Sequence, residues 1–334
     1  MSANRVSGAL EKVLVTGATG QLGNNLVRLL LNRGVSVRVL VRSKGPLAAL
    51  DGLDVESVVG SVEDADVVAK AIDGVCGVIH SAGCVLLGWR HADLHDRANH
   101  LGTRNLAAAS RQAGVRMVYV SSVNALGVAS IEQPGTEEWV AGQNPPCPYV
   151  LSKQAGERAV MAEVERGLHA VCVYPGFMLG PWDWKPSSGK MLLEVARRFT
   201  PFAPVGGFSI CDVRDVGAGV LAALEKGPAG RKFVLAGHNM SYLDAWNRFA
   251  KVSGGSRPLC RAGPLMRILA GKTGDLIGRF TRWEPVVNSA AVKLSDRFHC
   301  FSSQRAEEEL GYSVRPADES IQDAWKWFVQ HGYV

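Results

Sequence analysis

The sequence has no long apolar run and no processing signal that we can identify. None of its 334 residues lies in an unbroken apolar stretch close to the roughly 20 residues that span a membrane. Residues 1–12 are too short and too polar for a signal peptide. The composition is 47% hydrophobic and 20% charged, which excludes a disordered chain and is typical of globular proteins. We therefore expect a cytoplasmic globular protein.

Paired cysteine motifs and charged tracts are also absent. The seven cysteines are widely spaced, odd in number and without a C-x-x-C pair, so we expect free thiols and no metal site. The formal net charge of +6 comes from scattered basic residues, without the basic runs and interleaved aromatics of nucleic-acid binders. A phosphorylated cofactor fits this charge, and a solvated surface explains it equally well.

Three glycines stand where a short strand is expected to turn into a helix. Residues 13–15 are apolar, and Gly17, Gly20 and Gly23 follow before a helical segment that begins near Asn24. The first glycine permits a tight turn, the second lets the backbone approach a phosphate, and the third lets the helix pack closely. Together with Thr19, Gln21 and Leu22, they predict a pyrophosphate site at the start of a helix.

Short, valine-rich strands alternate with helical segments through the first half of the chain. The predicted strands are residues 13–15, 36–41, 55–60, 77–80, 117–121 and 170–174. Strands this apolar belong in a parallel sheet with helices on both faces, so the fold class is a doubly wound α/β (Rossmann) sheet. We assign residues 10–180 to it and residues 181–334 mainly to a smaller α/β substrate-binding lobe. Segments near 209–236 and 285–303 return to the sheet or to the lobe boundary.

Tyr149 and Lys153 are four residues apart in a segment expected to be helical after Pro148, so they share one face. A nearby ammonium group favours the phenolate, so we expect Lys153, together with an oxidised nicotinamide, to tune Tyr149 into a proton shuttle. Ser122 ends another apolar strand, where parallel sheets collect ligands, and could hydrogen-bond the reacting oxygen. The alternative for the pair is an amphipathic helix with an exposed lysine.

These residues resemble the extended short-chain dehydrogenase/reductases, above all the dihydroflavonol 4-reductase and 3β-hydroxysteroid dehydrogenase-like branch of the NAD-dependent epimerase/dehydratase family. The resemblance rests on motifs in the family's order along nearly the whole chain. They are Thr16-Gly17-Ala18-Thr19-Gly20-Gln21-Leu22-Gly23, His80-Ser81-Ala82-Gly83, Asn99-x-x-Gly102-Thr103, Ser121-Ser122, Tyr149-x-x-x-Lys153, Tyr174-Pro175-Gly176, Asp212-Val213-Arg214-Asp215-Val216 and Glu309-Leu310-Gly311-Tyr312.

The resemblance implies an enzyme in which hydride moves to or from nicotinamide C4. It implies that Ser122 polarises the substrate oxygen, that Tyr149 transfers its proton and that Lys153 also binds ribose. By the same resemblance, Ser81, Ala82 and Gly83 line the diphosphate and ribose, and Pro175, Gly176, Phe177 and Met178 meet the carboxamide. We take Asn99 as a structural residue and place His80 beneath the sheet.

The end of the second predicted strand favours NADP over NAD as the cofactor. An acid there would bind both ribose hydroxyls of NAD, but the strand ends in Arg42, with Lys44 nearby, and Arg42 suits a 2′-phosphate. A solvated basic turn is the alternative. Ser61 and Val62 stand where the family usually has an acid that contacts adenine, so Ser61 would have to make that contact.

The substrate is predicted less directly than the cofactor. Trp182 and Trp184 either cover the nicotinamide end of the site, favouring a flat apolar substrate, or pack the two lobes together. Residues 264–280 mix apolar and basic residues at helical spacing. We interpret them as a cap helix rather than a membrane-binding helix because their three glycines disfavour an independent interfacial helix, and we expect no membrane contact.

The favoured function is an NADP-dependent oxidoreductase that reduces a carbonyl, or oxidises the alcohol, of a hydrophobic small molecule. One alternative is a nucleotide-sugar epimerase or dehydratase that uses bound NAD with the same three residues. A second is a non-catalytic protein that senses the dinucleotide, although such a protein has no need of a proton relay. By analogy, the helices near residues 92–113 and 149–166 could form a homodimer interface.

Overall fold

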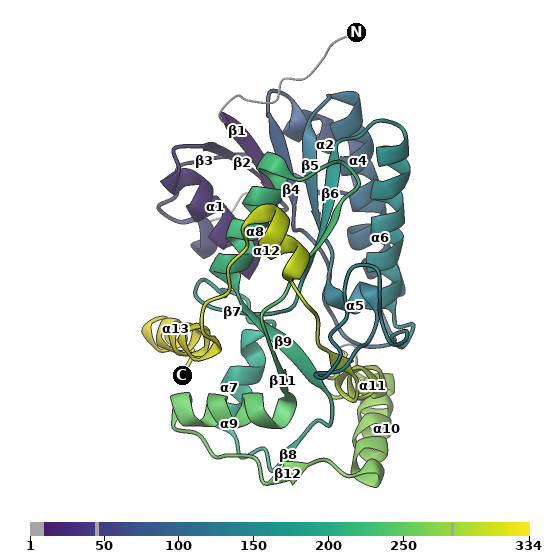
Figure 1. The fold of residues 1–334 in the computed structure, drawn as a ribbon, viewed down its shortest axis with the longest axis vertical. Coiled ribbons are helices and arrows are strands. Elements are labelled where there is room, and N and C mark those ends of the chain that lie inside the picture. The colour runs from purple at the N-terminus through teal and green to yellow at the C-terminus, as the bar shows by residue number, and fades with distance from the viewer. Residues whose placement is uncertain (1–9, 44–46, 282–283) are drawn as a thin grey trace.

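The larger of the two lobes contains a sheet of seven parallel strands in the order β10-β6-β5-β4-β1-β2-β3 (Figure 1). The structure is a computed structural model that describes residues 10–43, 47–281 and 284–334. The strands are β1 (Lys12–Thr16), β2 (Ser36–Val41), β3 (Val55–Val59), β4 (Gly77–His80), β5 (Arg116–Val120), β6 (Ala170–Pro175) and β10 (Lys232–Leu235). The predicted α/β fold and its six strands are confirmed, with small differences at strand ends.

Helices cover both faces of this sheet. One face carries α1 (Gln21–Asn32), α8 (Val213–Lys226) and α12 (Gln304–Leu310), and the other carries α2 (Ala65–Ile72), α4 (Gly102–Gln112) and α6 (Pro148–Glu165). Alternate residues of β1 supply the two cores, since Val13 and Val15 pack on the α1 side and Leu14 packs on the α2 side. Burial on both faces explains why the strands are apolar throughout.

The smaller lobe is built on a four-stranded sheet with β9 (Gly207–Asp212) at its centre. β11 (His238–Ser241) pairs antiparallel with β9, whereas β7 (Phe177–Leu179) and β13 (Phe298–His299) pair with it in parallel. Three helices, α7 (Gly189–Arg197), α9 (Tyr242–Ser253) and α13 (Ala317–Gln330), complete its core. The chain crosses between the lobes repeatedly: β9 leads into α8 of the large lobe, and β10 leads back to β11.

The remaining elements are short, apart from one helix at the edge of the smaller lobe. They are η1 (Ala48–Leu50), α3 (Ala92–His95), η2 (Asp96–Leu101), α5 (Val123–Leu126), β8 (Phe202–Ala203), β12 (Cys260–Arg261), α10 (Pro264–Phe280) and α11 (Ser289–Ser295). No helix in the described part of the chain is long and apolar enough to cross a membrane. All seven cysteines are free thiols.

Trp182 and Trp184 pack the two lobes together. Their rings cluster with Trp327 and His331 of α13 in the smaller lobe. On the other side, the Arg28 guanidinium of α1 lies 3.3 Å from the centroid of the Trp182 ring. A cation over an aromatic face is attractive, and the large rings bury much apolar surface. The structure thus favours the packing role for these tryptophans over the substrate-covering role.

Gly23 is the glycine whose replacement should test how α1 is placed. A Cβ at Gly23 would overlap the backbone carbonyl of Gly17, so Gly23→Ala must push α1 away from the turn. We expect this change to lower the free energy of unfolding by about 1–3 kcal/mol, the usual cost of overpacking, as measured by urea denaturation.

Gly217→Ala is the matched control, because a Cβ there would meet only the Leu29 side chain, at 3.9 Å. This position lies inside α8, where alanine is a better helix former than glycine. Its stability should stay equal or rise. A Gly23→Ala variant as stable as the wild type would contradict the close packing of α1 on the turn.

Candidate active site

The glycine turn between β1 and α1 leads into the first turn of α1, where a helix presents its amides to an anion. Gly17 has φ of +76°, and a Cβ there would lie 2.6 Å from the Ala82 nitrogen. Gly20 is the N-cap of α1, whose first turn has neither a side-chain cap nor an acidic residue. Free amides and the positive end of the helix dipole suit a diphosphate. The residues present therefore fit a dinucleotide cofactor.

Three other residues predicted for this turn have different surroundings. The Gln21 side-chain amide donates to the Gly180 carbonyl at 3.1 Å, so it anchors α1 to the crossing between the lobes. Leu22 is buried in the sheet core. Thr19 is half-buried within the turn. Only the backbones of Gln21 and Leu22 are therefore available for a phosphate.

The segment after β4 runs from the glycine turn to Lys153. The Ser81 hydroxyl donates to the Thr16 carbonyl at 2.7 Å, and the Ala82 amide donates to the Thr16 hydroxyl at 3.3 Å. Gly83 faces Lys153, because a Cβ there would lie 3.2 Å from its Nζ. Ser81, Ala82 and Gly83 thus join the glycine turn to the lysine, as a cofactor lying across the strand ends would require.

Tyr149, Lys153 and Ser122 come together at the carboxyl end of β5. Lys153 Nζ donates to the Val120 carbonyl at 2.9 Å, and Val120 is the last residue of β5. Tyr149 lies one turn earlier on α6 and is buried, and its phenol lies close enough to the Ser122 hydroxyl for that hydroxyl to lower its pKa. Ser122 also caps α5, since its Oγ accepts from the Asn124 amide at 3.2 Å. Lys153 is buried, which excludes the alternative of an exposed lysine on this helix.

Burial dominates the electrostatics of this pair in the protein without a cofactor. It raises the pKa of the Tyr149 phenol above its usual value, and the nearby Ser122 hydroxyl only partly opposes this. Burial also lowers the pKa of Lys153 to about 8. In both groups, desolvation penalises the charged form. The tuning of Tyr149 by Lys153 and a bound nicotinamide stays a prediction. Tyr149 is a protonated acid at neutral pH.

The residues expected near the adenosine are spread over the ends of β2 and β3. Arg42 is exposed at the end of β2 and has no ion-pair or hydrogen-bond partner among the described residues. Lys44 lies outside the described residues. Ser61 accepts from the Glu63 amide at 3.3 Å, and Val62 fills the space left by Gly102. Val62 thus has a packing role, whereas Arg42 is free to bind an anion.

Pro175, Gly176, Phe177 and Met178 form the crossing from the large sheet to the small one. Pro175 pairs with Leu235 at the end of β6, and the Gly176 amide donates to the Leu235 carbonyl at 3.2 Å. Phe177 stacks on Phe208 with ring centroids 4.4 Å apart. Phe177 and Met178 are each only partly buried. This crossing lies beside the end of β5, where Lys153 of α6 bonds the Val120 carbonyl, since β5 and β6 are neighbours.

A buried side chain that the sequence did not assign to the site, Asn99, holds α6 in place. Asn99 donates to Ser152 Oγ at 2.9 Å and to the Cys84 carbonyl at 2.9 Å, and its Oδ1 accepts from the Cys84 amide at 2.7 Å. Asn99 lies in η2, a short π-helix, a form often found at functional sites. Sequence analysis gave Asn99 only a structural role. The π-helix that places it has no signal in the sequence.

His80 lies beneath this site, as expected. Its ring bonds the hydroxyls of Thr16 at 2.7 Å and Thr103 at 3.0 Å. The side chain is fully buried, and this burial lowers its pKa to about 3. It is therefore neutral at neutral pH and ties β4 to β1 and α4.

Comparison with known proteins identifies the family. The profile of the NAD dependent epimerase/dehydratase family matches residues 13–236, from β1 to the end of β10. The chain belongs to this family. It is an NAD(P)-dependent enzyme of the extended short-chain dehydrogenase/reductase type, as the sequence motifs indicated.

Full-length relatives agree with this assignment. The chain is 35% identical over 329 residues to sterol demethylase protein B of Methylococcus capsulatus, covering 96% of this chain and 99% of the relative. It is 31% identical over 344 residues to a putative dihydroflavonol 4-reductase of Synechocystis, covering 100% and 99%. The crystal structure of gox2253 matches with a TM-score of 0.82 at 33% identity, covering 97% and 99%.

The buried histidine predicts how stability changes with pH. An unfolded chain binds a proton on His80 below pH of about 6.5, whereas the folded protein resists it down to about 3. Stability should therefore fall as pH drops between these values, by up to about 1.4 kcal/mol per pH unit from this residue. Urea denaturation of the wild type and of His80→Gln, repeated at several pH values across this range, measures how the free energy of unfolding changes with pH.

His80→Gln lacks this titration, so its stability should depend less steeply on pH even though its absolute stability is lower. The gap between the two proteins should narrow as pH falls. Parallel profiles would show that His80 is not held neutral in the folded protein.

Proposed function

We propose that this chain is an NADP-dependent oxidoreductase that reduces a carbonyl group of a hydrophobic small molecule, or oxidises the corresponding alcohol, with Tyr149 as the acid or base. The observation that carries the proposal is the arrangement of Tyr149, Ser122 and the buried Lys153 at the carboxyl end of β5. It puts two hydroxyl groups at one point, where both could bond a single substrate oxygen.

The charge states suit a reductase. Because burial keeps the Tyr149 phenol protonated, it can donate its proton to a carbonyl oxygen as that oxygen gains negative charge. The Ser122 hydroxyl polarises the same carbonyl through a second hydrogen bond. A bound nicotinamide would supply the hydride to the carbonyl carbon. In the reverse direction, Tyr149 takes the proton of the alcohol.

Lys153 would stabilise the phenolate of Tyr149 and donate hydrogen bonds to the ribose of the cofactor. Its ammonium lies against Gly83 and the Val120 carbonyl, so it is fixed between the strand ends and the segment after β4. A positive charge held there favours the transient phenolate that remains after proton transfer. The same ammonium has two further donors, which suit ribose hydroxyls.

Apolar side chains around the site support a hydrophobic substrate. Ala290 and Leu294 of α11 form a buried cluster with Tyr149. Val85, Leu86 and Leu87 follow Cys84 and are exposed. The two full-length relatives carry names that refer to a sterol and to a dihydroflavonol, both carbon-rich ring systems. These features favour a carbon-rich substrate over a nucleotide sugar.

The choice of NADP rests on Arg42. Its free guanidinium at the end of β2 stands where an acid would bind the ribose of NAD, and a guanidinium can bond a phosphate through two N–H groups. The turn therefore offers a positive charge to a 2′-phosphate.

Replacing Tyr149 with phenylalanine tests the reaction. Without the proton donor, kcat should fall about 10²- to 10⁴-fold, while the affinity for NADPH should change little. The measurement is steady-state oxidation of NADPH with a hydrophobic ketone, alongside a fluorescence titration of the cofactor. Tyr333→Phe is the control, because that hydroxyl bonds the Trp184 carbonyl away from the site and should leave kcat unchanged. Full activity in Tyr149→Phe would overturn the assignment.

Replacing Arg42 with aspartate tests the cofactor. The loss of a charged hydrogen-bond pair, about 1.5–3 kcal/mol, should raise the Kd for NADPH by more than tenfold, and NADH binding should stay equal or improve. Arg257→Asp makes the same charge change at an exposed position in the smaller lobe and should leave both affinities unchanged. A wild type that prefers NADH would refute the role of Arg42.

A further inference from the structure

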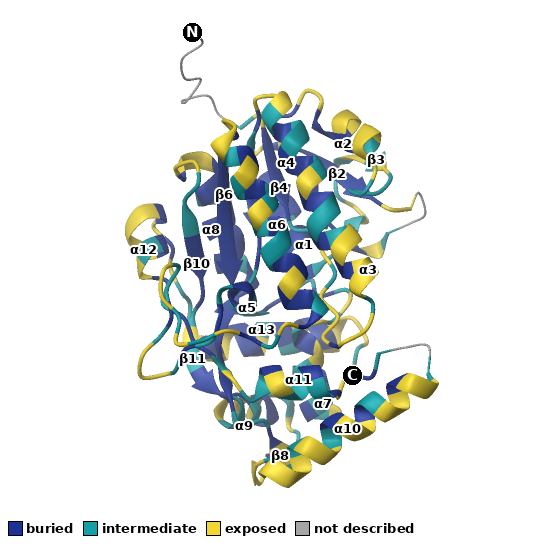
Figure 2. Cartoon of the chain, turned by 90° about the vertical axis from the view of Figure 1, so that its right-hand side faces the viewer, coloured by how far each residue is buried: buried dark blue, intermediate teal, exposed yellow. Residues whose placement is uncertain are grey.

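The helix α10 buries its glycines and exposes its large apolar side chains. Figure 2 shows exposed residues along much of this helix. Its buried residues are Gly271, Gly274 and Gly278. A Cβ at Gly274 would overlap the Val287 carbonyl, so the glycines let the helix lie directly on the backbone that leads to α11. A helix packed through an apolar stripe would show the opposite arrangement. The close contact of α10 with the protein is therefore made at its glycines, and its large apolar side chains stay largely exposed.

The outward face is large and strongly apolar. Leu265 is 70% exposed and Phe280 is 84% exposed, at the two ends of the helix. Between them, the other exposed apolar side chains are Met266, Ile268, Leu269, Leu276 and Ile277. Exposed apolar surface of this extent on one element marks an interaction site.

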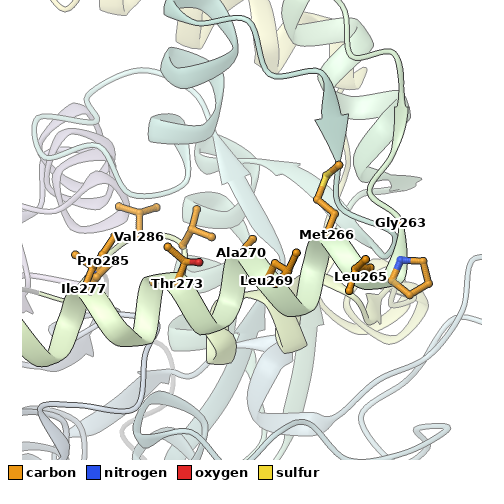
Figure 3. Close-up of a pocket in the computed structure, with 12 residues that line it drawn as sticks. Gly263, Leu265, Met266, Leu269, Ala270, Thr273, Ile277, Pro285 and Val286 are labelled. Atoms are coloured by element: carbon orange, nitrogen blue, oxygen red, sulfur yellow. The ribbon is translucent and has the colours of Figure 1, made fainter.

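Val286 and Val287 extend this face beside the helix. A groove of about 960 Å³ runs between them and α10, with Thr273 as the one lining residue that bears a polar side chain (Figure 3). Figure 3 shows Ile277 beside Pro285 and Val286 at one end of the groove and Met266 and Leu265 at the other. A hydrocarbon chain could lie along the groove without burying a charge.

The exposed charged side chains named here around this apolar face are basic. The exposed charged side chains of α10 are Lys272 and Arg279, and Arg261, Lys293 and Arg297 are exposed on neighbouring elements. The nearby acids point to partners within the protein. Asp275 accepts from the Ser289 amide at 2.9 Å, and Asp296 pairs with Arg267 at 2.6 Å. A basic margin around an apolar face complements an anionic lipid surface.

We propose that the outward face of α10, together with Val286 and Val287, docks on an anionic phospholipid bilayer, with the helix lying in the plane of the interface. Lys272 and Arg279 would meet the headgroups, and Leu276 and Phe280 would enter the acyl boundary. This proposal reverses the expectation of no membrane contact. The glycines that counted against an interfacial helix face the protein, where packing supports the helix.

The docking face is connected to the catalytic tyrosine. Asn288 follows it directly and donates to the Leu87 carbonyl at 2.8 Å, and Trp89 donates to the Ser289 hydroxyl at 2.7 Å. The next helix, α11, packs Ala290 and Leu294 against Tyr149. The docking itself does not depend on the reaction. That docking presents lipid-soluble substrate to Tyr149 is an extension that rests on the proposed function.

Vesicle co-sedimentation tests the proposal with the full chain. Vesicles of phosphatidylcholine and phosphatidylglycerol in equal parts should bind the wild type, and vesicles of phosphatidylcholine alone should bind it much less. The double variant Leu276→Asp/Phe280→Asp should bind the mixed vesicles at least tenfold more weakly. Lys272→Glu/Arg279→Glu should also lose at least tenfold, because each basic side chain contributes about fivefold near an anionic surface.

Val329→Asp is the matched control, since it places the same charge on an exposed apolar position of α13, in another helix of the smaller lobe. Its vesicle binding should equal that of the wild type, and circular dichroism should show all variants folded. Tyr149→Phe should bind vesicles normally, so a failure of the proposed reaction leaves this result unaffected. The proposal is overturned if the wild type does not bind the mixed vesicles or if both double variants bind them normally. It is also overturned if Leu276→Asp/Phe280→Asp instead splits a dimer in sedimentation equilibrium.

Discussion

The hydrogen bond from the Lys153 ammonium to the Val120 carbonyl fixes α6 on the end of β5. The Tyr119 hydroxyl bonds the Lys153 carbonyl at 3.3 Å, so the same residue is held from its backbone as well. Ser122 follows β5 directly, and Tyr149 precedes Lys153 by one helical turn. One contact between a helix and a strand end therefore determines where three groups of the site lie, and the glycine turn lies two strands away in the same sheet.

Burial of Lys153 and Tyr149 at the end of β5 shifts the pKa of both side chains. Lys153 and Tyr149 are both withdrawn from water, and each is pushed towards its neutral form. The cofactor-free protein thus holds a protonated phenol beside a lysine whose pKa is lowered by burial. A bound cofactor and substrate would change both environments, which makes the pair sensitive to what occupies the site.

Local patterns in the sequence were sufficient to predict the sheet, the glycine turn and part of the candidate site. The glycine spacing predicted the turn before α1, the apolar runs predicted the strands, and helical spacing placed Tyr149 and Lys153 on one face. The rest depends on contacts between distant segments. Asn288 and Leu87, for example, are separated by 201 residues, and no local pattern predicts their hydrogen bond. For the same reason, the sequence did not reveal that burial raises the pKa of Tyr149 or that the glycines of α10 face inward.

The tryptophan-rich segment after β7 shows that one sequence pattern is compatible with two structural roles. Bulky aromatics near a strand end suit either a substrate or the joint between two lobes, and only the position of α13 decides between them. The tryptophan cluster between the lobes also helps to place β7 and β9 near the end of β5. The packing of the two lobes therefore contributes to the geometry of the site.

The most direct measurement is transfer of deuterium from NADPH labelled at nicotinamide C4 to a hydrophobic ketone. The account predicts that each turnover consumes one cofactor and leaves deuterium on the carbinol carbon of the product. A sugar nucleotide that changes configuration without net consumption of cofactor and without label would contradict it, because that result belongs to an epimerase.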